Sequence, residues 1–207
     1  MVAPPSCSLW CNNAASARPS RALVAPTLRK LRPTHALRRD ETMPQAMDAL
    51  SLLMKDHDLV KDIFKKIESS EDEAERKSLF EQFMDEIAIH ERIEEEIFYP
   101  ALQKLPNARA DVMEAFEEHH VVDMIMSEMD VEPNDEKWDA KFTVMKENVE
   151  HHIKDEEEKL FPKAEKLLGK ETLGKLGAQM ADLKEEELRA LDEQAEEEEP
   201  EETMRKR

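Results

Sequence analysis

The feature that most constrains the fold of this chain is a pair of helical segments that occurs twice. A shift of 62 positions carries residues 90–100 onto residues 152–162 without a gap, so that His90 aligns with His152. The apolar positions before these segments keep the same register in both copies. Because an internal repeat of this kind marks a duplicated supersecondary unit, the sequence predicts two similar helix pairs that pack on each other.

Within each pair, apolar residues recur at steps of three and four, which is the period of an amphipathic α-helix. Beyond residue 40 the chain is rich in Glu, Lys, Leu and Met, and it has only the 3 glycines, which favours an all-helical domain. The apolar stripe is interrupted in both copies by the same polar residues, namely His57, His90 and Glu94 and their counterparts His119, His152 and Glu156.

The spacing of the four histidines predicts how the helices are arranged. Antiparallel neighbours are level only when the turn lies halfway between them, and the three midpoints fall in polar, turn-like stretches at 69–74, 104–107 and 131–135. We therefore expect an all-α fold, an antiparallel up-down-up-down four-helix bundle over residues 48–168, made of a duplicated helical hairpin. All four histidines would then lie in one layer of its core.

This layer has the composition of a metal centre. Positions i and i+4 share a face of a helix, so His90 and Glu94 point into the same part of the core, as do His152 and Glu156. Two buried carboxylates without compensation would be costly. Divalent cations remove that cost, because imidazole and carboxylate together suit Fe, Mn or Zn. We expect two ions, each bound by two histidines, with both glutamates as bridges and open positions for a small ligand.

The ordered series of a lone His, His-x-x-x-Glu, a lone His and again His-x-x-x-Glu resembles the hemerythrin-like HHE cation-binding domain. The resemblance covers residues 48–165. It implies a non-haem di-iron site. Members of that family range in function over oxygen binding, oxygen or iron sensing, and the handling of peroxide or nitric oxide.

The sequence departs from the respiratory hemerythrin pattern at two positions. Ala115 stands where that pattern has a second histidine on the third helix, and Glu156 follows its histidine by four residues rather than five. A site with one nitrogen ligand fewer favours oxidation or exchange of the iron over reversible oxygen carriage. Glu91, which follows a candidate ligand directly, is a candidate for a compensating extra ligand.

Residues next to the candidate ligands have a simpler interpretation. His120 and His151 point about 100° away from their neighbours around the helix, so we assign both to outer positions. Tyr99 and Phe161 are expected to close one end of the core. Four glutamates are interpreted as a solvated face, with one of them able to orient a ligand imidazole through its free N–H: Glu95, Glu96, Glu157 and Glu158.

Residues 1–39 differ sharply in charge from the rest of the chain. They contain six Arg, one Lys and no acid, so that all 49 acidic residues follow them. A basic segment rich in Ala, Pro and Ser, without a long apolar run, is typical of an organelle transit peptide, and the alternative is a disordered extension. Repeated prolines argue against a mitochondrial helix, so we expect the chloroplast, with the mitochondrion as the alternative. Residues 40–47 then form a linker.

Amino-acid composition also limits which metal ligands the chain can use and which classes of partner it can bind. Both cysteines, Cys7 and Cys11, lie in the N-terminal extension, so any metal bound by the rest of the chain needs nitrogen and oxygen ligands. The acidity of residues 40–207 argues against a nucleic-acid partner. No apolar run approaches the roughly 20 residues of a membrane-spanning helix.

The C-terminal part is expected to lie outside the bundle. Residues 169–192 are amphipathic and predict a fifth helix, which either packs on the bundle or contacts a protein partner. Residues 193–207 are predicted to be an acidic, disordered tail.

We interpret the chain as a non-haem di-iron protein that binds, senses or scavenges oxygen, nitric oxide or peroxide, or iron itself. One alternative is a di-iron enzyme of the peroxidase or NO reductase type. Another is an iron buffer or a structural helical bundle. The sequence does not decide among these functions, because all of them need the same ligands.

Overall fold

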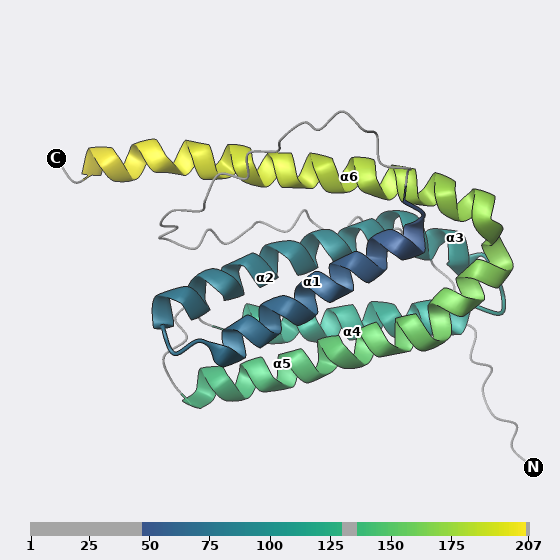
Figure 1. Ribbon diagram of the computed structural model, residues 1–207, viewed down its shortest axis with the longest axis horizontal. Helices are drawn as coiled ribbons and strands as arrows, with labels where there is room; N and C mark the ends of the chain where they lie inside the picture. Colours follow the sequence, from purple (N-terminus) through teal and green to yellow (C-terminus); the bar gives the residue numbers. More distant parts are fainter. Residues whose placement is uncertain (1–46, 130–135, 206–207) are drawn as a thin grey trace, which may run out of the picture. The chain divides into compact units, whose positions relative to one another are not determined.

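The computed structural model of the chain describes residues 47–129 and 136–205, with side chains described as far as residue 194. This part of the chain is built of helices, and no strand occurs in it (Figure 1). The predicted extension 1–39, the linker up to residue 46 and the third predicted turn at 131–135 lie outside the described residues.

Four long helices make up the bundle: α1 (Ala49–Ser69), α2 (Glu73–Ile93), α4 (Arg109–Ser127) and α5 (Glu136–Asp155). Four further segments follow α2 and α5: η1 (Glu94–Phe98), α3 (Tyr99–Gln103), η2 (Glu156–Leu160) and α6 (Phe161–Arg205). Helix α1 packs on α2 and α4 packs on α5, while α1 also contacts α5 and so joins the two pairs. The predicted all-α bundle of a duplicated hairpin is therefore confirmed.

The starts of the first two helices follow from local sequence. Asp48 caps α1 by accepting a hydrogen bond from the N–H of Ser51 at 2.9 Å, and Asp72 accepts one from Glu75 at the same distance. Such caps satisfy N–H groups that have no partner within the helix. The break at residues 70–72 and the break after Gln103 fall at the first two predicted turns.

The core consists of two apolar clusters with the polar layer between them. Along α1, α2 and α4, the histidine of the layer separates residues of one cluster from residues of the other. One cluster is rich in aromatic side chains, including Phe64, Phe80, Phe83, Trp138 and Phe142. The other includes Phe98, Tyr99, Leu102 and Phe161. The layer is thus surrounded by dry, packed side chains on both sides along the bundle axis.

Helix α6 bends sharply at Gly169, where the backbone has a φ of 72° that L residues with side chains rarely adopt. Beyond this bend α6 packs on α1 and α2 (Figure 1). Leu173 and Met180 are buried in this contact, as expected for the amphipathic segment. The helix continues to Arg205, past residue 192 where we expected it to end, and residues 193–199 consist of Glu, Gln and Ala, which are good helix formers.

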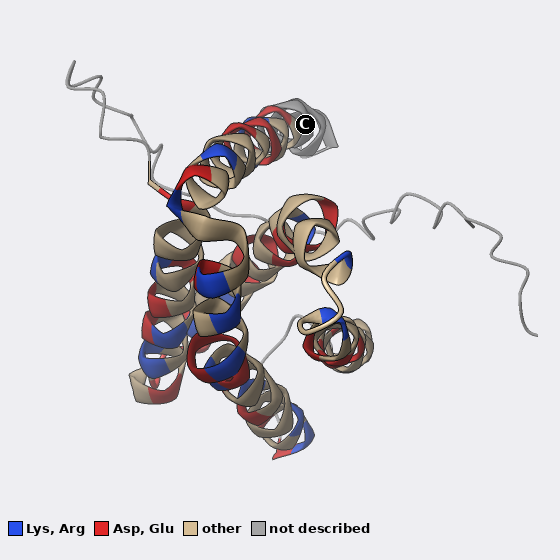
Figure 2. Cartoon of the chain, turned by 90° about the vertical axis from the view of Figure 1, so that its right-hand side faces the viewer, with Lys and Arg blue, Asp and Glu red and all other residues tan. Residues whose placement is uncertain are grey.

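Acidic and basic residues are interspersed along the helices (Figure 2). Some of them pair across helices, for example Lys146 with Glu68 at 2.5 Å. Exposed pairs of this kind add little to stability. None of the described helices is both long enough and apolar enough to cross a membrane.

Candidate metal centre

Each candidate glutamate begins a π-helical turn at the end of a long helix. Glu94 is the first residue of η1 and Glu156 is the first residue of η2. Proline follows six residues later in both copies, at Pro100 and Pro162. A proline has no N–H and its ring crowds the carbonyl four residues earlier, which here lies within the π-helical turn. The wider turn accommodates the ring, and turns of this kind are frequent at functional sites.

The structure brings the six sequence-predicted residues together in one buried layer. They come from α1, the α2–η1 junction, α4 and the α5–η2 junction, and all of them are at most 4% exposed. They are His57, His90, Glu94, His119, His152 and Glu156. The prediction that the four histidines lie at one height in the bundle thus agrees with their positions.

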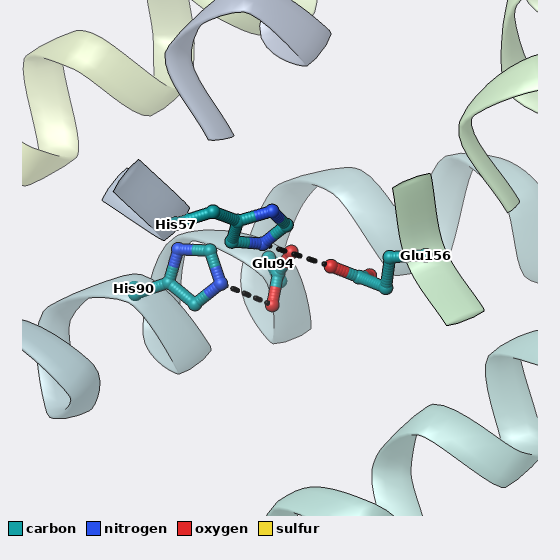
Figure 3. A group of neighbouring side chains, drawn as sticks. All are labelled: His57, His90, Glu94 and Glu156. Carbon is teal, nitrogen blue, oxygen red and sulfur yellow. Dashed lines mark ion pairs between the residues drawn. The ribbon is translucent and has the colours of Figure 1, made fainter. Parts of the chain in front are cut away.

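The Nε2 atoms of the histidines all face the two carboxylates. Nε2 of His57 lies 3.3 Å from Oε2 of Glu156, and Nε2 of His90 lies 3.3 Å from Oε2 of Glu94 (Figure 3). The second copy repeats this arrangement. His119 is 3.4 Å from Glu94, and His152 is 3.6 Å from Glu156. Each glutamate therefore contacts one histidine from each helix pair.

The donor atoms divide into two groups that share Glu94. His57, His90, Glu94 and Glu156 form one group, and Glu94, His119 and His152 form the other, with the atoms of each group within 4.8 Å of one another. This division matches the expected assignment of two histidines to each ion. Neither group includes Glu91, although that side chain is buried, so the structure does not place the suggested extra ligand at the centre. Ala115 is buried in the neighbouring apolar cluster.

A second ring of carboxylates faces the outward nitrogen, Nδ1, of every histidine and lies within hydrogen-bond distance of it in three of the four. Nδ1 of His57 lies 3.0 Å from Glu157, that of His119 lies 3.2 Å from Glu95, and that of His152 lies 2.9 Å from Glu118. Nδ1 of His90 lies 3.7 Å from Asp56. A carboxylate at Nδ1 fixes the ring orientation and leaves Nε2 free to bind a metal.

These four carboxylates are also related to one another by the 62-residue repeat. Glu95 aligns with Glu157, and Asp56 aligns with Glu118. We expected Glu95, Glu96, Glu157 and Glu158 to form a solvated face, with one of the four orienting a ligand imidazole, whereas two of them, Glu95 and Glu157, contact a histidine Nδ1. We did not predict this role for Asp56 or Glu118. Their position directly before a candidate histidine in both copies was the signal that could have revealed them.

One pair of repeat-related residues breaks the symmetry of the centre. The hydroxyl of Tyr99 lies 3.2 Å from Glu94, 2.9 Å from Glu156 and 3.3 Å from Nε2 of His119. Its counterpart Phe161 has no hydroxyl and stacks on the ring of His57, with centroids 5.6 Å apart. A phenol therefore reaches the carboxylates from one side only.

Burial and mutual charge shift the pKa values of these groups strongly. Burial, helped by the charge of Glu156, raises the pKa of Glu94 well above its ordinary value. Burial opposes ionisation of Glu156, but its contacts with His152 and His57 outweigh burial and hold its pKa low. Burial also lowers the pKa of His90 to about 4. In His119, by contrast, hydrogen bonds to Glu94 and Glu95 outweigh burial and raise the pKa.

The buried nitrogen and oxygen atoms at the centre are of the types that bind a cation. Within the described part of the chain, four buried atoms that face the centre have no hydrogen-bond partner: Nε2 of His57, Nε2 of His90, Oε1 of Glu94 and Oε2 of Glu156. Buried polar atoms of folded proteins are nearly always paired. Imidazole nitrogen and carboxylate oxygen are ligands for Fe, Mn and Zn, so this set of atoms fits a bound metal ion.

The comparisons with known proteins agree with this geometry. The family model described as the hemerythrin HHE cation-binding domain matches residues 48–164, which is more than half of the chain.

The chain belongs to the hemerythrin HHE cation-binding family.

A solved structure with the same architecture is that of a hemerythrin HHE cation-binding domain-containing protein from Mycobacterium kansasii. It shares 25% identity with this chain and superposes with a TM-score of 0.58. The match covers 68% of this chain and 87% of the mycobacterial chain. No curated protein sequence matches the chain. Family membership and the buried donor set together support cation binding by this HHE domain.

Proposed function

We propose that this HHE domain is a non-haem di-iron protein that binds or scavenges a small ligand such as oxygen, nitric oxide or peroxide. The observation that carries the proposal is the convergence of four Nε2 atoms on two buried carboxylates. His57 and His90 would bind one ion, and His119 and His152 the other. Glu94 and Glu156 would lie between the ions, and Mn or Zn remains a chemical alternative.

Two features of the site favour a small ligand. The protein would supply two nitrogens and shared carboxylate oxygens to each ion, a set small enough for iron, when bound, to supply its affinity for diatomic molecules and peroxide. The layer lies between two apolar clusters, which close it to large molecules along the bundle axis. Within this layer the carboxylate ring would hold each imidazole with its Nε2 inward.

The experiment is to purify residues 43–207, load the protein anaerobically with Fe(II), measure the iron content, and then admit oxygen or nitric oxide. We expect close to two irons per chain and a new charge-transfer absorption after the ligand is added. Glu94→Ala should lose both, whereas Glu96→Ala, an exposed neighbour, should keep both. Protein that binds no iron, or iron that gives no new absorption with any of these ligands, would argue against the proposal.

Tyr99 favours a second candidate function, the enzymatic reduction of peroxide. Its hydroxyl contacts both carboxylates at the centre, and burial raises its pKa well above its ordinary value, so the phenol stays protonated and donates a hydrogen bond. Reduction of peroxide to water consumes protons, which a buried phenol can deliver. Repeated turnover of peroxide with an added electron donor, slowed in Tyr99→Phe, would support the enzyme. A single stoichiometric reaction would support the binding protein instead.

We also propose, from composition alone, that residues 1–39 direct the protein to the chloroplast. The basic charge and the absence of acids are the supporting observations. A fusion of residues 1–47 to a fluorescent protein should then accumulate in plastids of plant cells. Accumulation in mitochondria would support the alternative compartment, and a cytosolic fusion would argue against a transit peptide.

A further inference from the structure

A third group of metal-type ligands lies on the surface, outside the central layer. Glu118 on α4 faces His151 and Asp155 on α5, and one donor atom of each lies within 4.8 Å of the others. Nε2 of His151 is 3.6 Å from Glu118 and 3.9 Å from Asp155. The His151 side chain is 62% exposed. One imidazole and two carboxylates make a donor set that suits a divalent transition-metal ion.

Two of these three residues, Glu118 and Asp155, line a cleft that reaches the buried centre. Glu118 and Asp155 contribute to its wall together with the acidic Asp111, and Ala115 and Glu156 form its buried end. The cleft has a volume of about 20 Å³, which is room for about one water molecule. Glu156 is only 2% exposed, and its Oε2 has no hydrogen-bond partner among the described residues. Five acidic side chains and one basic side chain, that of Lys159, line the cleft, and this excess of negative charge attracts cations.

Comparison of the two repeats shows that helix packing does not require this surface group. The residues that align with His151 and Asp155 are Ile89 and Ile93, which are 4% and 0% exposed. The residue that aligns with Glu118 is Asp56, whose Oδ1 accepts a hydrogen bond from Lys184 of α6 at 2.6 Å. In the first repeat, two of the three aligned positions are therefore apolar and the third contacts α6. The other has metal-type ligands beside an open cleft.

We propose that Glu118, His151 and Asp155 form a solvent-accessible site for a divalent transition-metal ion, from which ions pass through the cleft to the central ligands. The site itself stands on its own geometry, and its role in entry rests on the proposed metal centre. Glu118 belongs to both places, because its Oε1 faces His151 while its Oε2 contacts Nδ1 of His152. Lys159 now pairs with Asp155, and its exposed ammonium can move into water when an ion arrives.

The site can be tested on the full chain after its centre has been loaded with Fe(II) under anaerobic conditions. Mn²⁺ is then titrated, and the free ion is followed by its electron paramagnetic resonance signal. We expect an additional bound Mn²⁺, whose affinity falls at least about tenfold in His151→Ala, because even changes around metal ligands cost that much. Lys159→Met should tighten binding, because it removes a competing cation. His120→Ala, which alters another exposed histidine, is the matched control.

Unchanged Mn²⁺ binding in His151→Ala would overturn the proposed site. If the chain retains no Fe(II) but the Mn²⁺ results hold, the proposed di-iron function fails while the surface site stands. The entry role has a separate readout, the rate of Fe(II) uptake by stopped-flow mixing. Asp155→Asn and His151→Ala should slow uptake several-fold and leave the final iron content unchanged. Uptake at the wild-type rate in both variants would overturn the entry role.

Discussion

At the scale of single residues, every histidine of the centre has a carboxylate near each of its two ring nitrogens. The inward Nε2 faces a carboxylate of the centre, and the outward Nδ1 faces a carboxylate from a neighbouring helix. The carboxylate of Glu157 contacts two side chains at once, His57 at 3.0 Å and Lys61 at 2.9 Å. The positive charge of Lys61 lowers the pKa of Glu157 against the effect of burial, so the carboxylate stays ionised.

The first prediction concerns this outer carboxylate. Glu157→Gln should weaken metal binding by roughly 10–100-fold, because the imidazole of His57 loses the charged partner that orients it. Competition with a chromophoric chelator measures the affinity. Glu158→Gln changes the exposed neighbour and should leave the affinity unaltered. Equal affinities in the two variants would show that Glu157 has no orienting role.

The second prediction concerns Tyr99. Tyr99→Phe removes one oxygen and should lower the free energy of unfolding of the chelator-treated protein by about 1–3 kcal/mol, because buried acceptors then lose their donor. Urea denaturation followed by circular dichroism measures this change. The helical content should not change, since Phe161 shows that the same position of the other repeat accepts a phenyl ring. A stability equal to that of the wild type would mean that the hydroxyl contributes nothing to the fold.

At the scale of helices, the centre depends on two irregular features that the repeat preserves. The π-helical turns η1 and η2 begin at the two central glutamates, and each precedes a proline that the helix accommodates. Helix α6 adds a third feature, which only one half of the bundle has. Its Lys184 contacts Asp56, which in turn faces Nδ1 of His90. The packing of α6 is thereby connected to one candidate ligand.

The third prediction compares two glycines of α6. A Cβ on Gly177 would lie 2.3 Å from the carbonyl oxygen of Met47 and 2.6 Å from the backbone nitrogen of Ala49, whereas a Cβ on Gly174 would meet nothing within 4 Å. Gly177→Ala should therefore destabilise the protein by about 1–3 kcal/mol through overpacking. Gly174→Ala should stabilise it by up to about 1 kcal/mol, because alanine is the better helix former. Thermal unfolding of both variants measures the changes, and equal effects of the same sign would contradict the packing of α6 on α1.

At the scale of the whole molecule, the bundle holds buried ionisable groups whose protonation differs at neutral pH. The raised pKa values of Glu94 and His119 keep protons on this pair, while Glu156 is ionised and His90, with a pKa of about 4, is neutral. Metal ligands bind in their deprotonated form. Metal binding must therefore displace protons from the pair formed by Glu94 and His119.

The fourth prediction follows from this state of protonation. Addition of Fe(II) or Zn(II) to the chelator-treated protein at pH 7 should release protons, and the affinity should rise with pH, because groups with raised pKa values lose their protons more readily at higher pH. Calorimetric titrations in buffers of different ionisation enthalpy measure the release. The same additions should raise the thermal midpoint, because the folded state alone presents the ligand set. Binding without proton release would contradict the raised pKa values.

The helical fold and the six residues of the central layer could be predicted from the sequence, because apolar and ligand-type residues recur in it at regular spacings. The recurrence of His57, His90 and Glu94 at the spacing of His119, His152 and Glu156 indicates helices, their duplication and a shared layer. Such patterns depend only on the geometry of the α-helix, which is local and regular. The same regularity predicted the first two turns.

The tertiary structure decided what depends on contacts between helices. We did not distinguish Asp56 and Glu118 from other acidic residues in the sequence. Their role depends on the packing of α2 and α5, which places His90 near Asp56 and His152 near Glu118. The phenol of Tyr99 has a role only because η1 turns it toward Glu156, 57 residues away in sequence. Covering of the first repeat by α6, and the open cleft beside the second, likewise arise from packing between distant segments. The spacing of residues in the sequence specifies which face of a helix is buried. Only the packing of the helices specifies which side chains from other helices contact that face.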